Sequence, residues 1–173
     1  FNAFAYQGVP NDMAARLNQL NQQRALIDDV VLTEAGRWFI LFGDNGYFSN
    51  GAPQEMLNYL QQWNAEGEVI NSITFNDVGD WVIIGQTKYA ASDSDITYLL
   101  NQGSSEHGEL WTACLTEDGM VAVYEGGYKY LGNVPYALKE QLKTTDINVW
   151  RLKFLADGSF FFADIYGEYS GYF

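Results

Sequence analysis

The feature that most constrains this chain is an internal repeat with a period of about 40 residues. Its clearest marks are four short segments that pair an acidic residue with a glycine, flanked on both sides by apolar residues at every second position. Such alternation places one face of each flanking strand in a core, and a turn glycine accepts the positive φ that other residues resist. The sequence therefore predicts four hairpins with positive φ at their turn glycines, which are Gly36, Gly79, Gly119 and Gly158.

Aligning the copies on these glycines predicts which strand positions are equivalent. The residue two positions after the glycine is expected to occupy the same buried site in every copy. Cys114 stands five positions before its glycine, in a column whose other members are apolar, polar and charged, so we expect a half-exposed and unreactive thiol. The buried site is predicted for Trp38, Trp81, Val121 and Phe160, and the mixed column contains Val31, Thr74, Cys114 and Lys153.

A second landmark precedes each hairpin. Pro10, Pro53 and Pro135 each open a segment with apolar residues at spacings of three and four, and Asp93 takes the equivalent place in the third copy. Proline suits the first turn of a helix, where its missing N–H would have no partner, and an acidic residue is favoured there by the helix dipole. The narrow apolar stripe predicts a helix that lies on a sheet. The stripe positions are Met13, Leu17, Met56, Leu60, Ile96, Leu100, Leu138 and Leu142.

Tyrosine-rich segments between each hairpin and the next helix predict a third strand in every copy. The predicted fold is α+β, with four tandem helix–β–β–β repeats and antiparallel sheets that carry helices on one face. One copy cannot bury its apolar faces alone, so the copies should stack in a propeller-like ring or an open array. We expect a single repeat domain over 1–173, with units at 8–49, 50–90, 91–131 and 132–173 and an extra N-terminal strand over 1–7.

The charge balance excludes several classes of partner. A formal net charge of −13 disfavours binding to nucleic acid and to anionic membrane surfaces. No apolar run is long enough to cross a bilayer, so we expect no membrane insertion. The chain begins at Phe1 rather than at methionine, which favours a processed, secreted protein at an extracellular or cell-surface location.

The sequence lacks the residue patterns of common catalytic and metal sites. His107 is the single histidine and falls in a segment that we expect to form a solvated loop. Glu34, Asp77 and Glu117 share one turn position, and such repetition indicates turn chemistry, since an active site needs only one copy. The acidic segments near Asp44 and Asp93 do not match the EF-hand spacing. We expect no enzymatic activity, no metal site and no cofactor.

Two functions remain. The first is a structural or self-assembling role, in which strand addition between chain ends builds a head-to-tail filament. The second is binding of carbohydrate or protein by a row of exposed tyrosines, although tyrosines at these positions can instead pack beneath the helices. The expected assembly residues are Phe1, Phe4, Tyr6, Tyr172 and Phe173, and the expected ligand-binding residues are Tyr47, Tyr89, Tyr130 and Tyr169.

Overall fold

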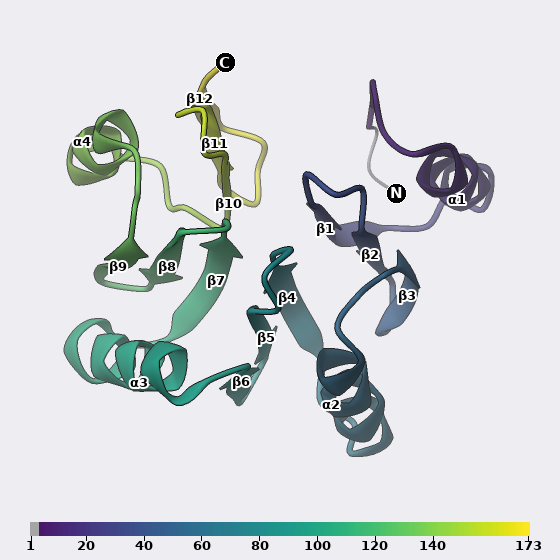
Figure 1. Cartoon of the computed structure of the whole chain (residues 1–173), viewed down its shortest axis with the longest axis horizontal. Helices are drawn as coiled ribbons and strands as arrows, with labels where there is room; N and C mark the ends of the chain where they lie inside the picture. The colour runs from purple at the N-terminus through teal and green to yellow at the C-terminus, as the bar shows by residue number, and fades with distance from the viewer. Residues whose placement is uncertain (1–3) are drawn as a thin grey trace. The chain divides into compact units, whose positions relative to one another are not determined.

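The computed structural model describes residues 4–173 and confirms the α+β class and the helix–β–β–β repeats (Figure 1). Within that range, four helices alternate with four three-stranded antiparallel sheets, and the strand order in each sheet follows the chain. The elements are α1 (Asn11–Gln22), β1 (Ile27–Leu32), β2 (Trp38–Phe42), β3 (Gly46–Asn50), α2 (Gln54–Ala65), β4 (Ile70–Phe75), β5 (Trp81–Gly85), β6 (Tyr89–Ala91), α3 (Ser94–His107), β7 (Leu110–Leu115), β8 (Gly119–Tyr124), β9 (Gly127–Gly132), α4 (Tyr136–Thr144), β10 (Arg151–Phe154), β11 (Phe160–Ala163) and β12 (Tyr169–Tyr172).

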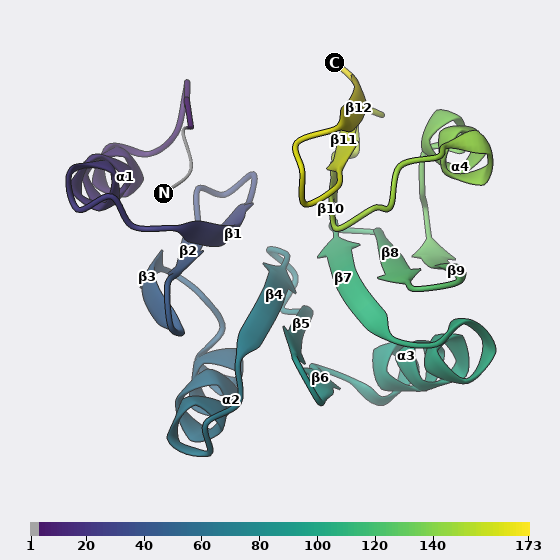
Figure 2. The same cartoon turned by 180° about the vertical axis from the view of Figure 1, so that it is seen from behind.

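The described chain forms two compact units that divide after Ala90. The first unit contains the first two repeats, with sheet A (β1–β3) and sheet B (β4–β6). The second unit contains the last two, with sheet C (β7–β9) and sheet D (β10–β12). Within the units, β1 lies beside β4 and β7 lies beside β10 (Figure 2). No helix in the described range is long and apolar enough to cross a membrane.

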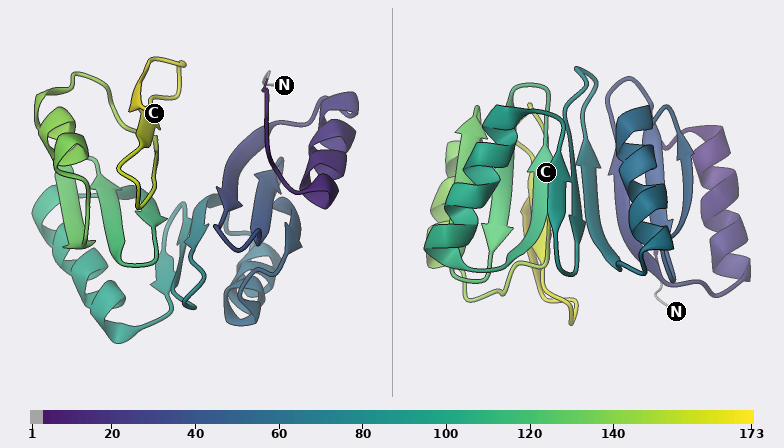
Figure 3. Two further views of the ribbon diagram at one scale, coloured as in Figure 1. Left: turned by 45° about the horizontal axis from the view of Figure 1, so that its top comes forward. Right: turned by 90° about the horizontal axis from the view of Figure 1, so that it is seen from below.

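The helices form where the apolar stripes predict them, and all eight predicted stripe residues are buried. Three of the four helices begin directly after a proline. The exception begins after Asp93, whose carboxylate accepts a 2.8 Å hydrogen bond from the Ile96 N–H and so caps the helix. Each helix lies along one side of its own sheet, which we call the front face (Figure 3).

The turn prediction is confirmed at three glycines and wrong at the fourth. Gly36, Gly79 and Gly158 have φ values of 80°, 103° and 95°. Gly119 instead begins strand β8, because the third hairpin is one residue shorter than the others and needs no left-handed residue there. A side chain is excluded at Gly119 for another reason, since a Cβ atom would lie 2.0 Å from the Asn133 carbonyl oxygen.

The shorter hairpin changes which residues are equivalent. Leu115 pairs with Met120, as Leu32 pairs with Trp38 and Phe75 with Trp81. Met120 therefore takes the position predicted for Val121, and Val121 points to the opposite side of sheet C because neighbouring strand residues alternate in direction. Both residues are fully buried, so burial alone does not reveal the shift.

The opposite side of a sheet, its back face, packs against the next repeat within each unit. Phe39 and Leu41 on the back of sheet A join one apolar core with α2 and with the front of sheet B. The back of sheet C joins the core of α4 and sheet D in the same way. Cys114 belongs to this covered face and is buried, which corrects the expectation of a half-exposed thiol.

The predicted N-terminal strand is not formed over its described part, residues 4–7, and residues 1–3 lie outside the described range. Phe4 packs against the core between α1 and sheet A, and the Tyr6 hydroxyl donates a 2.8 Å hydrogen bond to Asn18 of α1. A strand needs a neighbouring strand to satisfy its backbone groups. This segment instead contacts the helix that follows it.

Candidate functional site

Tyrosines of the first, third and fourth copies occupy one structural column, and the third copy contributes Tyr128 and not Tyr130. Tyr47 pairs with Leu41, Tyr128 with Val123 and Tyr169 with Ala163, which are equivalent positions of their sheets. Tyr130 lies two residues further along, opposite Val121. Two tyrosines in one strand made both assignments compatible with the sequence, and only the register separates them.

The column is not a row of exposed rings. Tyr47 stacks on Phe39 with ring centroids 5.3 Å apart and packs at the edge of the first unit's core. Tyr89, Tyr128 and Tyr130 are half-buried, and burial, together with the nearby Tyr128 and Glu140, raises the pKa of Tyr130 to about 12. Tyr169 differs because it is 67% exposed, although it stacks on Phe161 at 5.7 Å.

The residues expected to mediate assembly divide between the two ends. Phe4 and Tyr6 are held against the first repeat, and Phe1 lies outside the described residues. At the other end, Tyr172 and Phe173 are 63% and 90% exposed, and the Tyr172 ring also stacks on Phe160. Of the expected assembly residues, the two exposed rings thus lie in the edge strand β12 of the last sheet and directly after it.

The residues weighed for catalysis and metal binding do not converge. No cluster of three or more His, Cys, Asp or Glu residues in the described part of the chain could hold a metal ion. His107 is the last residue of α3 and is half-buried, so the predicted solvated loop is wrong; the helix continues through that segment up to Gly108, which has a φ of 89°. Its Nε2 atom lies 3.6 Å from a Glu106 oxygen.

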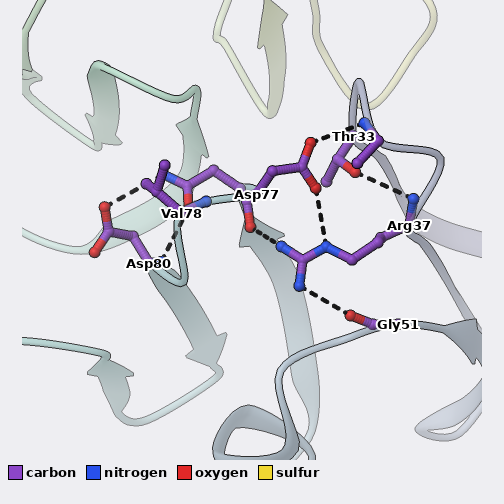
Figure 4. Close-up of polar contacts among 8 residues, drawn as sticks. Thr33, Arg37, Gly51, Asp77, Val78 and Asp80 are labelled. Atoms are coloured by element: carbon purple, nitrogen blue, oxygen red, sulfur yellow. Dashed lines mark hydrogen bonds and ion pairs between the residues drawn. The ribbon is translucent and has the colours of Figure 1, made fainter.

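A polar cluster joins the two hairpin turns of the first unit (Figure 4). Arg37 Nε donates to Asp77 Oδ1 at 2.9 Å, and the Ala35 N–H donates to Asp77 Oδ2 at 2.9 Å. The same guanidinium donates to the backbone carbonyls of Asn76 and Gly51. Burial opposes the charged form of Asp77, but its hydrogen bonds with Thr33, Ala35 and Arg37 outweigh it and lower the pKa of that carboxyl. One of the repeated turn acids therefore has a structural role.

A second polar contact joins the same two repeats at the opposite end of β2. We call the contact region between the two repeats of a unit their junction. Asn45 has a φ of 60° and lies in the turn between β2 and β3. Its side chain donates to the Glu68 carbonyl oxygen at 2.6 Å and accepts from the Ile70 N–H at 2.8 Å. The turn is thereby tied to the loop between α2 and β4.

The corresponding place in the second unit is an open hollow of about 250 Å³. The turn between β8 and β9 is shorter, and its Gly126 N–H donates to the His107 carbonyl oxygen at 2.8 Å. Within residues 4–173, no hydrogen bond joins this turn to the loop between α4 and β10. The hollow is lined by aromatic, acidic and amide side chains, among them Trp111, Glu125, Tyr128, Asp146 and Asn148.

The repeat pattern does not reveal this hollow, although the sequence contains two signals for it. The turn Glu125-Gly126 is shorter than Gly43-Asp44-Asn45 and lacks the asparagine. Helix α4 has 9 residues where α1 and α2 have 12, which leaves a longer loop before β10. Comparison with known proteins adds no further guide: no family model, no curated protein and no solved structure matches this chain.

Proposed function

We propose that this is a non-enzymatic structural repeat protein whose copies associate head to tail through two incompletely covered sheet faces. The observation that supports the proposal is a difference in burial between equivalent positions. Inside each unit, the back face of one sheet packs on the front face of the next. The front of sheet A and the back of sheet D lack such a neighbour within their own unit, and both carry apolar residues that are less buried than their equivalents elsewhere in the chain.

The front of sheet A is covered by α1 and Phe4 only in part. Val30 and Ile27 are half-buried, whereas their equivalents on sheet B, Ile73 and Ile70, are 1% and 4% exposed. The equivalence follows from the strand register, in which Val30 pairs with Ile40 and Ile73 with Ile83. On sheet B, the back of sheet A covers these residues.

The back of sheet D carries an aromatic pair that is less buried than its equivalent on sheet A. Phe161 and Tyr169 repeat the stacked pair formed by Phe39 and Tyr47 on sheet A. Phe39 is fully buried, but Phe161 is half-buried and Tyr169 is mostly exposed. Burial of exposed apolar surface of this kind stabilises an association by roughly 25 cal/mol per Å² of buried area.

These two faces correspond to the pair that meets inside each unit, so the back of sheet D should accept the front of sheet A from a second copy. Because the two faces differ, such a contact repeats from copy to copy and builds a filament. Face packing replaces the expected strand addition in this proposal, since residues 4–7 form no strand. Meeting of the same faces within one chain would instead give the propeller-like ring.

Sedimentation of the protein over a range of concentrations tests the proposal. Phe161→Asp should block one face and Val30→Asp the other, so that each variant alone is monomeric. A mixture of the two should form dimers and nothing larger, because each variant retains one intact face. Tyr136→Asp, at an exposed position of α4, is the matched control and should assemble like the parent protein. A parent protein that is monomeric at every concentration would overturn self-association and favour the ring.

A second candidate function is binding of a glycan or protein through the tyrosine column. Its support is the exposure of Tyr169, which is 67% exposed where Tyr47, Tyr89 and Tyr128 are half-buried. Tyr169→Ala should then remove binding to an immobilised glycan or protein array, while Tyr47→Phe should not. Equal loss in both variants, or no hit on the array with folded protein, would contradict this function.

A further inference from the structure

We infer that the hollow in the second unit is a binding site for a neutral saccharide. The site lies wholly within that unit, between the end of sheet C and the loop that leads from α4 into β10. It is separate from the two sheet faces proposed for self-association, so either function can fail without the other.

One wall of the hollow is aromatic. Trp111 occupies the extra position of a β-bulge between Leu110 and Thr112, where the first two repeats have Asp28 and Asn71. A bulge redirects a side chain out of the regular alternation, and here it directs a large ring toward the hollow. Tyr128 lines the same space. Aromatic faces provide a flat apolar surface on which the C–H face of a sugar ring can pack.

The lining also contains polar side chains, beside the apolar Val123, Ile147 and Val149. Glu125, Asp146 and Asn148 line the hollow and are exposed, and within residues 4–173 their side chains have no protein partner. Carboxylates accept hydrogen bonds, whereas the Asn148 amide, the Tyr128 hydroxyl and the Trp111 Nε1–H can donate. Saccharide hydroxyls both donate and accept, so they match this mixed set.

The alternatives fit the lining less well. Two carboxylates repel an anion. A cation would be attracted to the carboxylates and to the rings, but it would leave the donors of Asn148, Tyr128 and Trp111 without acceptors. The protein also provides a cation of its own at this edge, since the Arg151 guanidinium lies 5.3 Å from the centre of the Trp150 ring, which packs beside Trp111.

The hollow belongs to one junction and is not a general feature of the repeat. Asn45 ties turn to loop at the corresponding place of the first unit, with bonds to Glu68 and Ile70. A feature that served only to join repeats would be expected at both junctions. Its volume of about 250 Å³ is just below the range of pockets for drug-sized ligands, which suits one sugar residue of a longer chain.

Isothermal titration calorimetry and saturation-transfer NMR test the inference with maltose, cellobiose, lactose and chitobiose as neutral probes and tetramethylammonium as the cationic probe. At least one disaccharide should bind in the millimolar range. Trp111→Ala should weaken that binding by about tenfold, because it removes the stacking surface. Since this change can also disturb folding, Glu125→Gln provides a second test at an exposed position. The matched control is Asp44→Asn, the acidic residue in the corresponding turn of the first unit.

Loss of binding in Trp111→Ala and Glu125→Gln with retention in Asp44→Asn would support the site. Three results would overturn it: no binding of any disaccharide, disaccharide binding that neither substitution in the hollow weakens, or binding of tetramethylammonium alone. The last result would identify the hollow as a site for cations.

Discussion

In the first unit, Asn45 reaches from the turn after β2 to the loop before β4, whereas the corresponding turn in the second unit stops short of its loop beside a hollow. The hairpin turns show the same contrast. Arg37 and Asp77 join the two turns of the first unit, while the third hairpin is one residue shorter and begins β8 directly at Gly119. The two units share the same order of elements and the same sheet packing. They differ in the polar contacts that join their two repeats.

The difference separates two kinds of residue in a repeat. Apolar stripe and strand positions recur in both units because stacking requires them. Turn residues are free to differ, since one residue added or removed there leaves the strand pairing intact on either side. The polar contacts of the first unit are thus fixed by few residues, and substitutions at these residues can test the contrast.

The largest effect is expected where a covered face is compared with an uncovered one. Phe39→Ala should lower the free energy of unfolding by about 3–5 kcal/mol, because Phe39 is fully buried between sheet A and the second repeat. Phe161→Ala, at the equivalent but half-buried position of sheet D, should cost less than half as much. Urea unfolding at a concentration where the protein is monomeric measures both. Equal costs would show that the back of sheet D is covered in solution.

The next largest effect concerns the polar contacts between the two hairpin turns of the first unit. Asp77→Ala should destabilise the protein by about 2 kcal/mol, because it leaves Arg37 and the Ala35 N–H without their acceptor. The pKa of Asp77 is lowered in the folded state, so its contribution is full above the ordinary value of 3.8 and is lost as the pH falls through the folded pKa. Urea unfolding at neutral and acidic pH should therefore show the parent and the variant converging at low pH. Glu34→Ala, in the equivalent turn of the first repeat, should change little at either pH.

Removing the contact at Asn45 should have a smaller effect. Asn45→Ala should cost about 1–2 kcal/mol, since the Ile70 N–H and the Glu68 carbonyl lose their partner and alanine tolerates the φ of 60° less well. Asp44→Ala, at the exposed neighbouring position, serves as the control. Thermal unfolding would contradict the role of Asn45 if both variants melted together.

Much of the fold could be predicted from the sequence, because helix stripes and strand alternation are set by burial and every copy repeats them. All eight stripe residues are buried, and the third strands follow the hairpins as expected. The register of the third copy was harder to predict. Met120 follows Gly119 directly, whereas the other copies have one more residue between the glycine and the strand. Because this strand has apolar residues on both of its faces, the alternation of apolar and polar residues does not reveal a shift of one position.

The hollow depends on residues that differ between the repeats, so an alignment of the repeats does not reveal it. Trp111 stands at a bulge position where the first two copies have Asp28 and Asn71, and Asp146 and Asn148 lie in a loop that the shorter α4 lengthens. Each deviation is visible in the sequence once the register is known. Their convergence on one space follows from the packing of the fourth repeat on sheet C, which single-chain patterns do not encode.

The smallest effect is expected where the second unit is open. The double substitution Glu125→Ala with Asp146→Ala removes two exposed carboxylates that have no protein partner within residues 4–173, so unfolding should change by less than about 0.5 kcal/mol. Removing two negative charges from a chain of net charge −13 also relieves repulsion, which favours a slight gain over a loss. Urea unfolding of the variant beside Asn45→Ala makes the comparison direct, since the substitutions lie at corresponding ends of the two junctions. If the double variant lost as much free energy of unfolding as Asn45→Ala, polar groups would stabilise both junctions. The contrast between a closed junction and an open one would then be wrong.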